Sequence, residues 1–318
     1  MANINLKDFK SLINGLYQAE GLLGAYFQSK GSLNLKPNFA IGQNYSKEAV
    51  ILFLQLQHVL GGIGYLKLEL SNTGSVHVKF VVTKATDILN IVIPYLNQLH
   101  GQKRRDLQKF SLIYNLAGSL SDHWDPLEAT QFLYLVYSLN PDGNKRKLTL
   151  DEKLEALGLS LPTTVPELPQ EIKNKQLPSI PFIIGFFLGD GTLGVTLDDP
   201  PARYPMVYVK LFFEISQKTS TDTLDMFTLF SQVLSEFFQV SINSRGSGST
   251  LISVSGKRVG SEVLPLLSQF YDLLYWKTPQ YDVTSQVATI VFNKGHLSKE
   301  GLKQIVRLLY SSPVFSRK

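Results

Sequence analysis

Two carboxylates stand at the same place in two similar phrases of the sequence, "GLYQAEG" at residues 15–21 and "GFFLGDG" at residues 185–191. Each phrase begins and ends with glycine and carries its acid, Glu20 or Asp190, just before the closing glycine. Mg²⁺ prefers such oxygen ligands and commonly takes one or two carboxylates together with phosphate oxygens and waters. Two such acids brought together could bind a divalent cation beside a phosphodiester, activate water and stabilise the leaving oxygen.

Two helices are expected to position these acids. Apolar residues recur at helical spacing up to Glu20, and an apolar run leads to Asp190, so we predict helices over residues 12–20 and 182–190. Small residues four positions apart in each helix would let two helix backbones approach closely. We therefore expect the helices to pack side by side and to bring the acids together. The small residues expected at this repeat interface are Gly15, Ala19, Gly185 and Gly189.

An acid at the C-terminal end of a helix is electrostatically unfavourable, because that end carries partial negative charge. Two neighbouring carboxylates add repulsion unless one is protonated or a cation binds them. A single copy has a structural explanation, since a glycine after a helix commonly caps it in a left-handed conformation. The second copy, with the same elements after it, favours a divalent-metal site.

The whole chain reads as two repeats. Glu20 and Asp190 are 170 residues apart (190 − 20), and Gln43 and Gln217, each followed by an amphipathic helix, are 174 apart (217 − 43). A near-constant offset of this kind indicates an internal duplication. The order within each repeat is helix, strand, strand, helix, strand, strand, helix, with a further helix at the end, which predicts the α+β class.

Residues 140–178 join the repeats and are rich in proline and charge. The part that reads "LTLDEKLEALG" predicts a short helix, and the proline-spaced remainder cannot be regular. We interpret this segment as a tether that lets the second repeat dock on the first. The expected domains are therefore residues 1–139, a linker at 140–178, and residues 179–318.

Strict alternation of apolar and polar residues predicts strands at 64–70 and 75–80, joined by a hairpin at "SNTG". Polar and apolar residues alternate again at 240–256 in the second repeat. Helices are expected to cover the apolar face and to leave the polar face free. In the first repeat this apolar face is predicted to consist of Leu66, Leu68, Leu70, Val76, Val78 and Phe80.

Composition narrows the function classes. The net charge of +5 and the sequence pI of about 9.1 are compatible with a polyanionic partner. The chain has no cysteine, which excludes disulfides and thiolate zinc sites, and its five histidines are far apart. Its longest apolar runs are too short to span a bilayer, and its first residues lack a signal-peptide pattern.

The two phrases, extended to "INGLYQAEG" at 13–21 and "IIGFFLGDG" at 183–191, resemble the name-giving nonapeptide of the LAGLIDADG homing endonucleases in their double-motif, single-chain form. The resemblance covers nearly the whole chain. It implies an αββαββα unit used twice, antiparallel sheets that form a DNA-binding saddle, and motif helices packed at the repeat interface. It departs at the sixth motif position, often Asp in the family, which is Gln18 in the first copy and Leu188 in the second.

The resemblance also implies roles for particular residues. In the family the acid at the eighth motif position binds metal together with the carbonyl of the preceding residue, a glutamine lies near the metal waters, and a lysine lies near the scissile phosphates. The implied metal ligands are Glu20, Asp190, Ala19 and Gly189. The implied catalytic residues are Glu20, Asp190, Gln43, Gln217, Lys103 and Lys277.

The polar strand faces are the expected DNA-binding surface, because basic and amide side chains recognise base edges in the major groove. A strand of about ten residues spans about one turn of B-DNA, so two repeats would read about 20 base pairs. Different side chains in the two halves predict an asymmetric target. The expected contacts of the first repeat are Tyr26, Gln28, Lys30, Lys36, Asn38, Lys67, Glu69, His77 and Lys79. Those of the second repeat are Thr196, Asp198, Lys210, Glu214, Asn243, Arg245, Ser253 and Ser255.

The function that this implies is a monomeric, Mg²⁺-dependent double-strand DNA endonuclease. Mn²⁺ is the expected substitute, whereas Ca²⁺ is expected to bind without supporting cleavage. Two alternatives remain open, an RNA maturase that assists group I intron splicing and a non-catalytic DNA-binding protein of the same fold. Intron RNA is thus a second candidate partner, and no membrane partner is expected. By resemblance alone, the location is intracellular and organellar, in mitochondria or chloroplasts.

Overall fold

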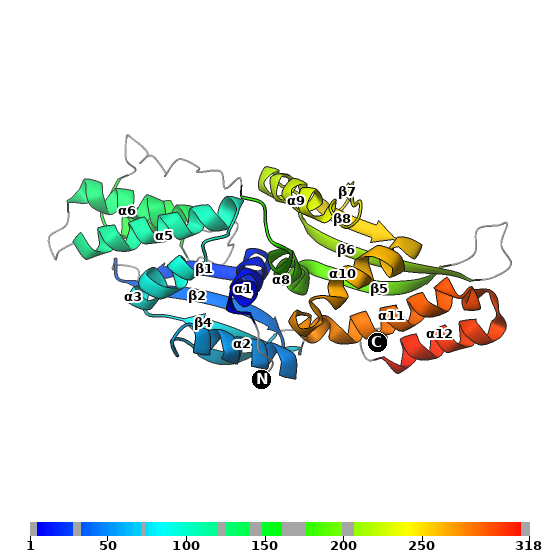
Figure 1. Cartoon of the computed structure of the whole chain (residues 1–318). Coiled ribbons are helices and arrows are strands. Elements are labelled where there is room, and N and C mark those ends of the chain that lie inside the picture. Colours follow the sequence, from blue (N-terminus) through cyan, green and yellow to red (C-terminus); the bar gives the residue numbers. More distant parts are fainter. Residues whose placement is uncertain are drawn as a thin grey trace. The chain divides into compact units, whose positions relative to one another are not determined.

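A computed structural model describes residues 5–27, 33–71, 74–119, 125–139, 148–160, 176–198 and 207–312 (Figure 1). The chain forms two compact units, Glu20–Lys175 and Met1–Ala19 together with Gln176–Lys318. Each unit contains one four-stranded antiparallel sheet with helices, so the α+β class is confirmed. Except for its last residue, helix α1 (Leu6–Glu20) groups with the second repeat rather than the first.

The unit Glu20–Lys175 is built on a sheet with the strand order β1-β2-β4-β3. Its strands are β1 (Gly21–Phe27), β2 (Leu35–Asn44), β3 (Tyr65–Leu70) and β4 (Val76–Val82). Its helices are α2 (Lys47–Val59), α3 (Ala85–Asp87), η1 (Ile88–Val92), α4 (Ile93–Tyr95), α5 (Gly101–Ser119), α6 (Pro126–Ser138) and α7 (Leu150–Ala156).

The other unit contains a sheet with the equivalent order β5-β6-β8-β7, so the two repeats share one topology. Its strands are β5 (Gly191–Asp198), β6 (Tyr208–Lys218), β7 (Ser241–Arg245) and β8 (Ser249–Ser255). Besides α1, its helices are α8 (Ile180–Asp190), α9 (Thr221–Leu234), η2 (Val259–Val263), α10 (Leu264–Ser268), η3 (Tyr271–Leu273), η4 (Tyr275–Lys277), α11 (Thr278–Phe292), η5 (Gly295–Leu297) and α12 (Lys299–Ser311).

The two motif helices, α1 and α8, pack directly on each other within one unit (Figure 1). A Cβ atom at Gly15 would overlap the carbonyl oxygen of Phe182, and a Cβ atom at Gly185 would overlap that of Leu12. Backbone therefore meets backbone at both glycines, which requires residues without a side chain. Ala19 lies in the last turn of α1 and is partly exposed. Gly189 occupies the corresponding turn of α8, is also partly exposed, and precedes Asp190.

Strand alternation is confirmed in the first sheet, but its apolar face is buried over a smaller area than predicted. Val78 and Phe80 on the inner strand β4 are fully buried. Leu68 and Leu70, by contrast, are 61% and 73% exposed, and Val76 is 41% exposed. Strand β3 is the edge of the sheet, and Leu70 pairs with Val76 at the hairpin end. Helix α2 contacts both β4 and β3, but its cover does not extend to the hairpin end of the two strands.

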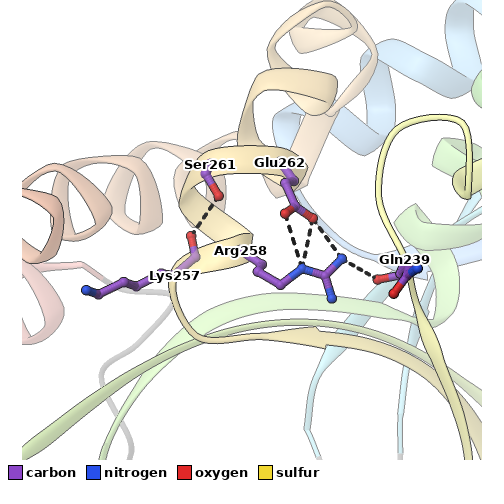
Figure 2. A network of polar contacts seen from close by, with 5 residues as sticks. All are labelled: Gln239, Lys257, Arg258, Ser261 and Glu262. Carbon is purple, nitrogen blue, oxygen red and sulfur yellow. Dashed lines mark hydrogen bonds and ion pairs between the residues drawn. The ribbon is translucent and has the colours of Figure 1, made fainter.

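The third helix of each repeat contains a π-helical turn. Both turns, η1 and η2, are followed two residues later by a proline, Pro94 or Pro265. Proline lacks an N–H, and its ring collides with the carbonyl four residues earlier, so the wider turn accommodates it. In the second repeat Arg258 braces the start of η2 by bonding the Glu262 carboxylate and the carbonyl of Gln239 (Figure 2).

Part of the predicted linker packs into the unit Glu20–Lys175. Thr149 and Glu152 form a capping box that starts α7, which confirms the short helix expected there. Leu154 is buried, and the ammonium of Lys153 lies 4.2 Å from the centroid of the Phe27 ring in β1. Residues 140–147 and 161–175 of that linker lie outside the described part of the chain.

Candidate functional site

The acid of the second repeat lies at the junction of α8 and β5. Asp190 is partly exposed, and the Gln217 Nε2 donates a hydrogen bond to its Oδ2 at 2.6 Å. Gln217 reaches the acid from the end of β6, on the face of the sheet that also carries the buried Phe213 and Ile215. A hydrogen bond to an ionised carboxylate is stronger than one between neutral groups, so this bond fixes the orientation of the Asp190 side chain.

Two neighbouring side chains bind the backbone on either side of Asp190. The Lys277 Nζ donates to the carbonyl oxygen of Gly191 at 2.6 Å and lies 5.5 Å from the centroid of the Phe187 ring. The Trp276 Nε1 donates to the carbonyl oxygen of Leu188 at 3.1 Å. An ammonium and an indole N–H therefore bind the backbone on either side of Asp190, while the Gln217 amide binds its carboxylate.

The first repeat places the equivalent residues at the junction of α1 and β1. Glu20 is the exposed last residue of α1, and the Lys103 Nζ donates to the carbonyl oxygen of Gly21. Gly21 pairs with Ile41 as Gly191 pairs with Ile215 in the second repeat. Gln43, two residues beyond Ile41, thus has the register position of Gln217.

Gln43 differs from its counterpart in its hydrogen bonding. Its Nε2 is buried, with no hydrogen-bond partner among the described residues. A buried amide donor without an acceptor is costly. Its position at the end of β2, close to Gly21 in register, suits an oxygen ligand such as water or phosphate. The second repeat instead satisfies this donor with the carboxylate of Asp190.

These donor sets fit a divalent cation held with the help of substrate. Among the described residues, no group of three or more His, Cys, Asp or Glu side chains gathers in a way that could hold a metal ion. Mg²⁺ does not require such a cage, because it usually takes one or two carboxylates plus phosphate oxygens and waters. Each junction by itself supplies one carboxylate of this kind, the exposed Glu20 in one unit and the partly exposed Asp190 in the other.

The register places the described DNA-contact candidates of the first repeat on one face of its sheet. On this face Glu69 forms two ion pairs. Its Oε1 lies 2.8 Å from the Lys67 Nζ, and its Oε2 lies 2.5 Å from the Lys79 Nζ. The two lysines lower the pKa of Glu69 to about 2. Gln28 and Lys30 lie outside the described residues. The candidates that share the face are Tyr26, Lys36, Asn38, Lys67, Glu69, His77 and Lys79.

The candidates of the second repeat also share one face of their sheet. Arg245 in the edge strand β7 forms an ion pair with Glu214 in β6 at 2.8 Å. This pair spans the intervening strand β8 and so links β7 to β6. The candidates on the face are Thr196, Asp198, Lys210, Glu214, Asn243, Arg245, Ser253 and Ser255.

Sequence reasoning missed residues of two kinds. Tyr65 and Tyr208 lie on the same sheet faces and are 46% and 51% exposed. The alternation that selected their neighbours could have found both, since they lie on the same faces as the candidate contacts. No sequence pattern pointed to Trp276, the neighbour of Lys277, because its hydrogen-bond partner Leu188 lies 88 residues earlier in the sequence.

No helix in the described ranges is long and apolar enough to cross a membrane.

Comparisons with known proteins follow the same lines. Residues 13–114 match the sequence model of a family described as LAGLIDADG endonuclease. The chain is 26% identical over 323 residues to the "Probable intron-encoded endonuclease 2" of Neurospora crassa. That alignment covers 95% of this chain and 65% of the relative, so the chain spans just under two thirds of the relative's length.

Solved structures resemble the chain over both repeats. I-SmaMI bound to an uncleaved DNA target in the presence of calcium ions is 21% identical, with a TM-score of 0.75 and coverage of 96% of this chain and 98% of that one. The LAGLIDADG homing endonuclease I-GzeII in complex with its DNA target is 20% identical, with a TM-score of 0.74 and coverage of 97% and 99%. Residues 13–114 are thus similar to the LAGLIDADG endonucleases, and the chain as a whole has the fold of I-SmaMI and I-GzeII.

Proposed function

We propose that this chain is a monomeric homing endonuclease that makes a double-strand break in an asymmetric DNA site of about 20 base pairs. The observation that carries the proposal is the recurrence of one set of residues in both repeats. Each set has an acid at a helix–strand junction, a glutamine at one register position, and a lysine bound to the carbonyl that follows the acid. A helix–strand junction that served only folding would not require the same acid, glutamine and lysine in both repeats.

Glu20 and Asp190 are proposed to hold a divalent cation, Mg²⁺ in the first instance, with the carbonyls of Ala19 and Gly189. When bound, this cation supplies a Lewis acid beside the scissile phosphate and lowers the pKa of a coordinated water. The packing of α1 on α8 supports the assignment, because the helices meet at their motif glycines. Each acid follows its glycine by five residues (20 − 15 and 190 − 185).

The neighbouring side chains are proposed to orient the acids and neutralise the phosphate. The Gln217 amide holds the Asp190 carboxylate in one orientation, and the buried Gln43 amide is placed to bind a water or phosphate oxygen. The Lys103 and Lys277 ammonium groups bind the carbonyl of the residue that follows each acid. At this position their positive charge would stabilise negative charge that develops on phosphate oxygens.

The two sheet faces are proposed to read the two halves of the DNA site. The described first face carries three lysines and one acid, whereas the second carries two lysines, one arginine and two acids. Faces that differ this much fit different half-sites, so we propose an asymmetric target. The relative from Neurospora crassa is named as intron-encoded, which supports an organellar gene for this chain as well.

Selection of cut sites from a randomised double-stranded DNA library tests the proposal. The wild type, Glu20→Gln and Asp190→Asn are compared in Mg²⁺, in Mn²⁺ and in Ca²⁺. Glu155→Gln and Asp225→Asn remove exposed acids elsewhere and serve as matched controls. We expect the wild type and both controls to cut one long asymmetric site in Mg²⁺ or Mn²⁺, and the two acid variants to bind it uncut.

Two results would contradict the proposal. Cutting by Glu20→Gln or Asp190→Asn at the wild-type rate would show that the acids have no part in hydrolysis. Failure of the wild type to cut or enrich any DNA, together with specific binding of intron RNA, would replace the nuclease with a maturase.

A further inference from the structure

The peptide backbone is left-handed two residues before each proposed lysine. Gly101, two residues before Lys103, has φ of 51°, and Tyr275, two residues before Lys277, has φ of 42°. The two positions are 174 residues apart (275 − 101), as are the lysines (277 − 103). The same unusual conformation therefore recurs at equivalent places in both repeats.

Tyrosine is an unexpected residue for this conformation. Tyr275 and Lys294 are the two non-glycine residues with positive φ in the described ranges. Lys294 follows the end of α11, where a left-handed residue is ordinary. A bulky aromatic residue with positive φ is an outlier, and such residues persist only where the surrounding structure holds them.

The surroundings of Tyr275 show what holds it. Its side chain is 9% exposed, with its ring centroid 6.3 Å from that of Trp276. The next two residues each donate to a carbonyl oxygen beside Asp190, Trp276 to that of Leu188 and Lys277 to that of Gly191. The bend thus lies between a buried ring and two hydrogen bonds to the acid-bearing junction.

The first repeat makes the same bend differently. Gly101 adopts positive φ without steric cost. Gln102, at the position of Trp276, uses its amide within its own helix, donating to Asp106 Oδ1 at 2.6 Å and accepting from Arg105 Nη2 at 2.9 Å. Lys103 still reaches the carbonyl after the acid. Backbone conformation is therefore the feature common to the two repeats, while the side chains differ.

We propose that Gly101 and Tyr275 are positioning residues, whose left-handed backbone turns the chain so that the ammonium two residues later meets the carbonyl that follows the acid. The catalytic consequence rests on the nuclease function proposed above. Each bend then serves the cleavage of one DNA strand. The placement of the lysines does not depend on that function and is measurable without DNA.

Variants that separate backbone conformation from packing test the proposal. Val rejects positive φ, whereas Gly and Asn accept it. The variants are Tyr275→Val, Tyr275→Gly, Gly101→Val and Gly101→Asn, with Gly101→Ala as a milder change that keeps the test open if Gly101→Val does not fold. Competitive acetylation of the lysine amines, read by mass spectrometry, reports their placement, with the exposed Lys47 and Lys257 as internal references.

If backbone conformation places Lys277, Tyr275→Val should raise its acetylation rate more than Tyr275→Gly does. If packing of the ring places it, the order of the two variants should be reversed. We expect Tyr275→Val to raise the acetylation rate of Lys277 several-fold, because a β-branched side chain restricts the backbone more than tyrosine does and disfavours positive φ further. Tyr275→Gly, although it removes the whole ring, is expected to leave that rate close to the wild type. Similarly, Gly101→Val and Gly101→Ala raise the rate of Lys103, and Gly101→Asn does not. If Tyr275→Gly exposes Lys277 as much as Tyr275→Val does, or if no variant changes either rate, the proposal is overturned.

Strand-resolved cleavage then tests the consequence. Gly101→Val and Tyr275→Val are expected to lower kcat for opposite strands, with KM unchanged, because about 1 Å of misplacement costs up to about a hundredfold in rate. A rise in KM on both strands, with kcat unchanged, would show that the two bends affect only the general folding of the protein. If the acetylation rates change as expected but the wild type cuts no DNA, the positioning role stands and the nuclease proposal fails.

Discussion

At the scale of single residues, the two repeats use the same side chains with different bonding. The Gln217 Nε2 donates a hydrogen bond to Asp190, whereas the Nε2 of Gln43 is buried without a hydrogen-bond partner among the described residues. Lys103 and Lys277 both bind the carbonyl after the acid. This shared placement makes the lysines the most direct targets for substitution.

Lys103→Met and Lys277→Met remove the charge while keeping side-chain length. Each variant is expected to slow hydrolysis of one DNA strand by about a hundredfold or more, the effect of losing one preorganised electrostatic group. Rates of nicking on separately labelled strands measure the change. Lys257→Met, at an exposed lysine, is the matched control and should cut both strands like the wild type. Equal slowing of both strands by a single variant would contradict the assignment of one lysine to each strand.

Glu69 makes the first sheet face sensitive to acid. Hydrogen bonds from Lys67 and Lys79 lower its pKa from 4.5 to about 2. A carboxyl with a depressed pKa in the folded state contributes stability that is present above its unfolded pKa and lost as pH falls through the folded pKa. We expect the stability difference between the wild type and Glu69→Gln to shrink from pH 4.5 to pH 2. Urea unfolding across this range measures it, and a difference that is constant with pH would contradict the expectation.

Residue-level chemistry was predictable where a pattern repeats and unpredictable where a contact is remote. The acids and glutamines could be named as candidates because each recurs at nearly the same offset, and the lysines because the resemblance to the family points to them. Trp276 has no counterpart in the first repeat, where Gln102 stands. The left-handed backbone of Tyr275 depends on a buried ring and on bonds to the far end of α8, which no local propensity encodes.

At the scale of elements, the contact of α1 with α8 depends on two glycines. Gly15→Ala or Gly185→Ala would place a methyl group on a backbone carbonyl of the other helix. We expect each to lower the free energy of unfolding by at least about 1–3 kcal/mol, the usual cost of overpacking, because backbone cannot move aside as a side chain can. Chemical denaturation measures this. Gly246→Ala, at a glycine with open space around it, is the control and should be nearly neutral.

Alternation predicted the faces of the strands better than the extent of their burial. Val78 and Phe80 are buried as expected, because β4 lies inside the sheet. Leu68 and Leu70 obey the same alternation but are exposed, since β3 is an edge strand. Sequence period sets which face a residue occupies, whereas strand order and helix cover decide whether that face is buried. The π-helical turns before Pro94 and Pro265 likewise needed the structure to be seen.

At the scale of the whole molecule, the two sheet faces differ in charge. Since each phosphate contact adds a slope of about −0.9 to the dependence of log affinity on log salt, each lysine of the first face that contacts a phosphate should account for a part of the salt dependence. We expect Lys36→Gln or Lys79→Gln to reduce this slope by about 1. Lys299→Gln, in α12, is the control and should leave it unchanged. Titrations of labelled target DNA at several salt concentrations measure the slope, and equal effects of all three variants would contradict a localised DNA surface.

The central claim is that Glu20 and Asp190 enable metal-dependent hydrolysis, and strand-resolved cleavage of the selected DNA site by the wild type, Glu20→Gln and Asp190→Asn in Mg²⁺ tests it most directly. Binding of each protein to the same site is measured in parallel in Ca²⁺. The account predicts that both variants bind like the wild type and lose cleavage by about two orders of magnitude or more. Variants that cut at the wild-type rate, or whose cutting falls only in proportion to their binding, would contradict it.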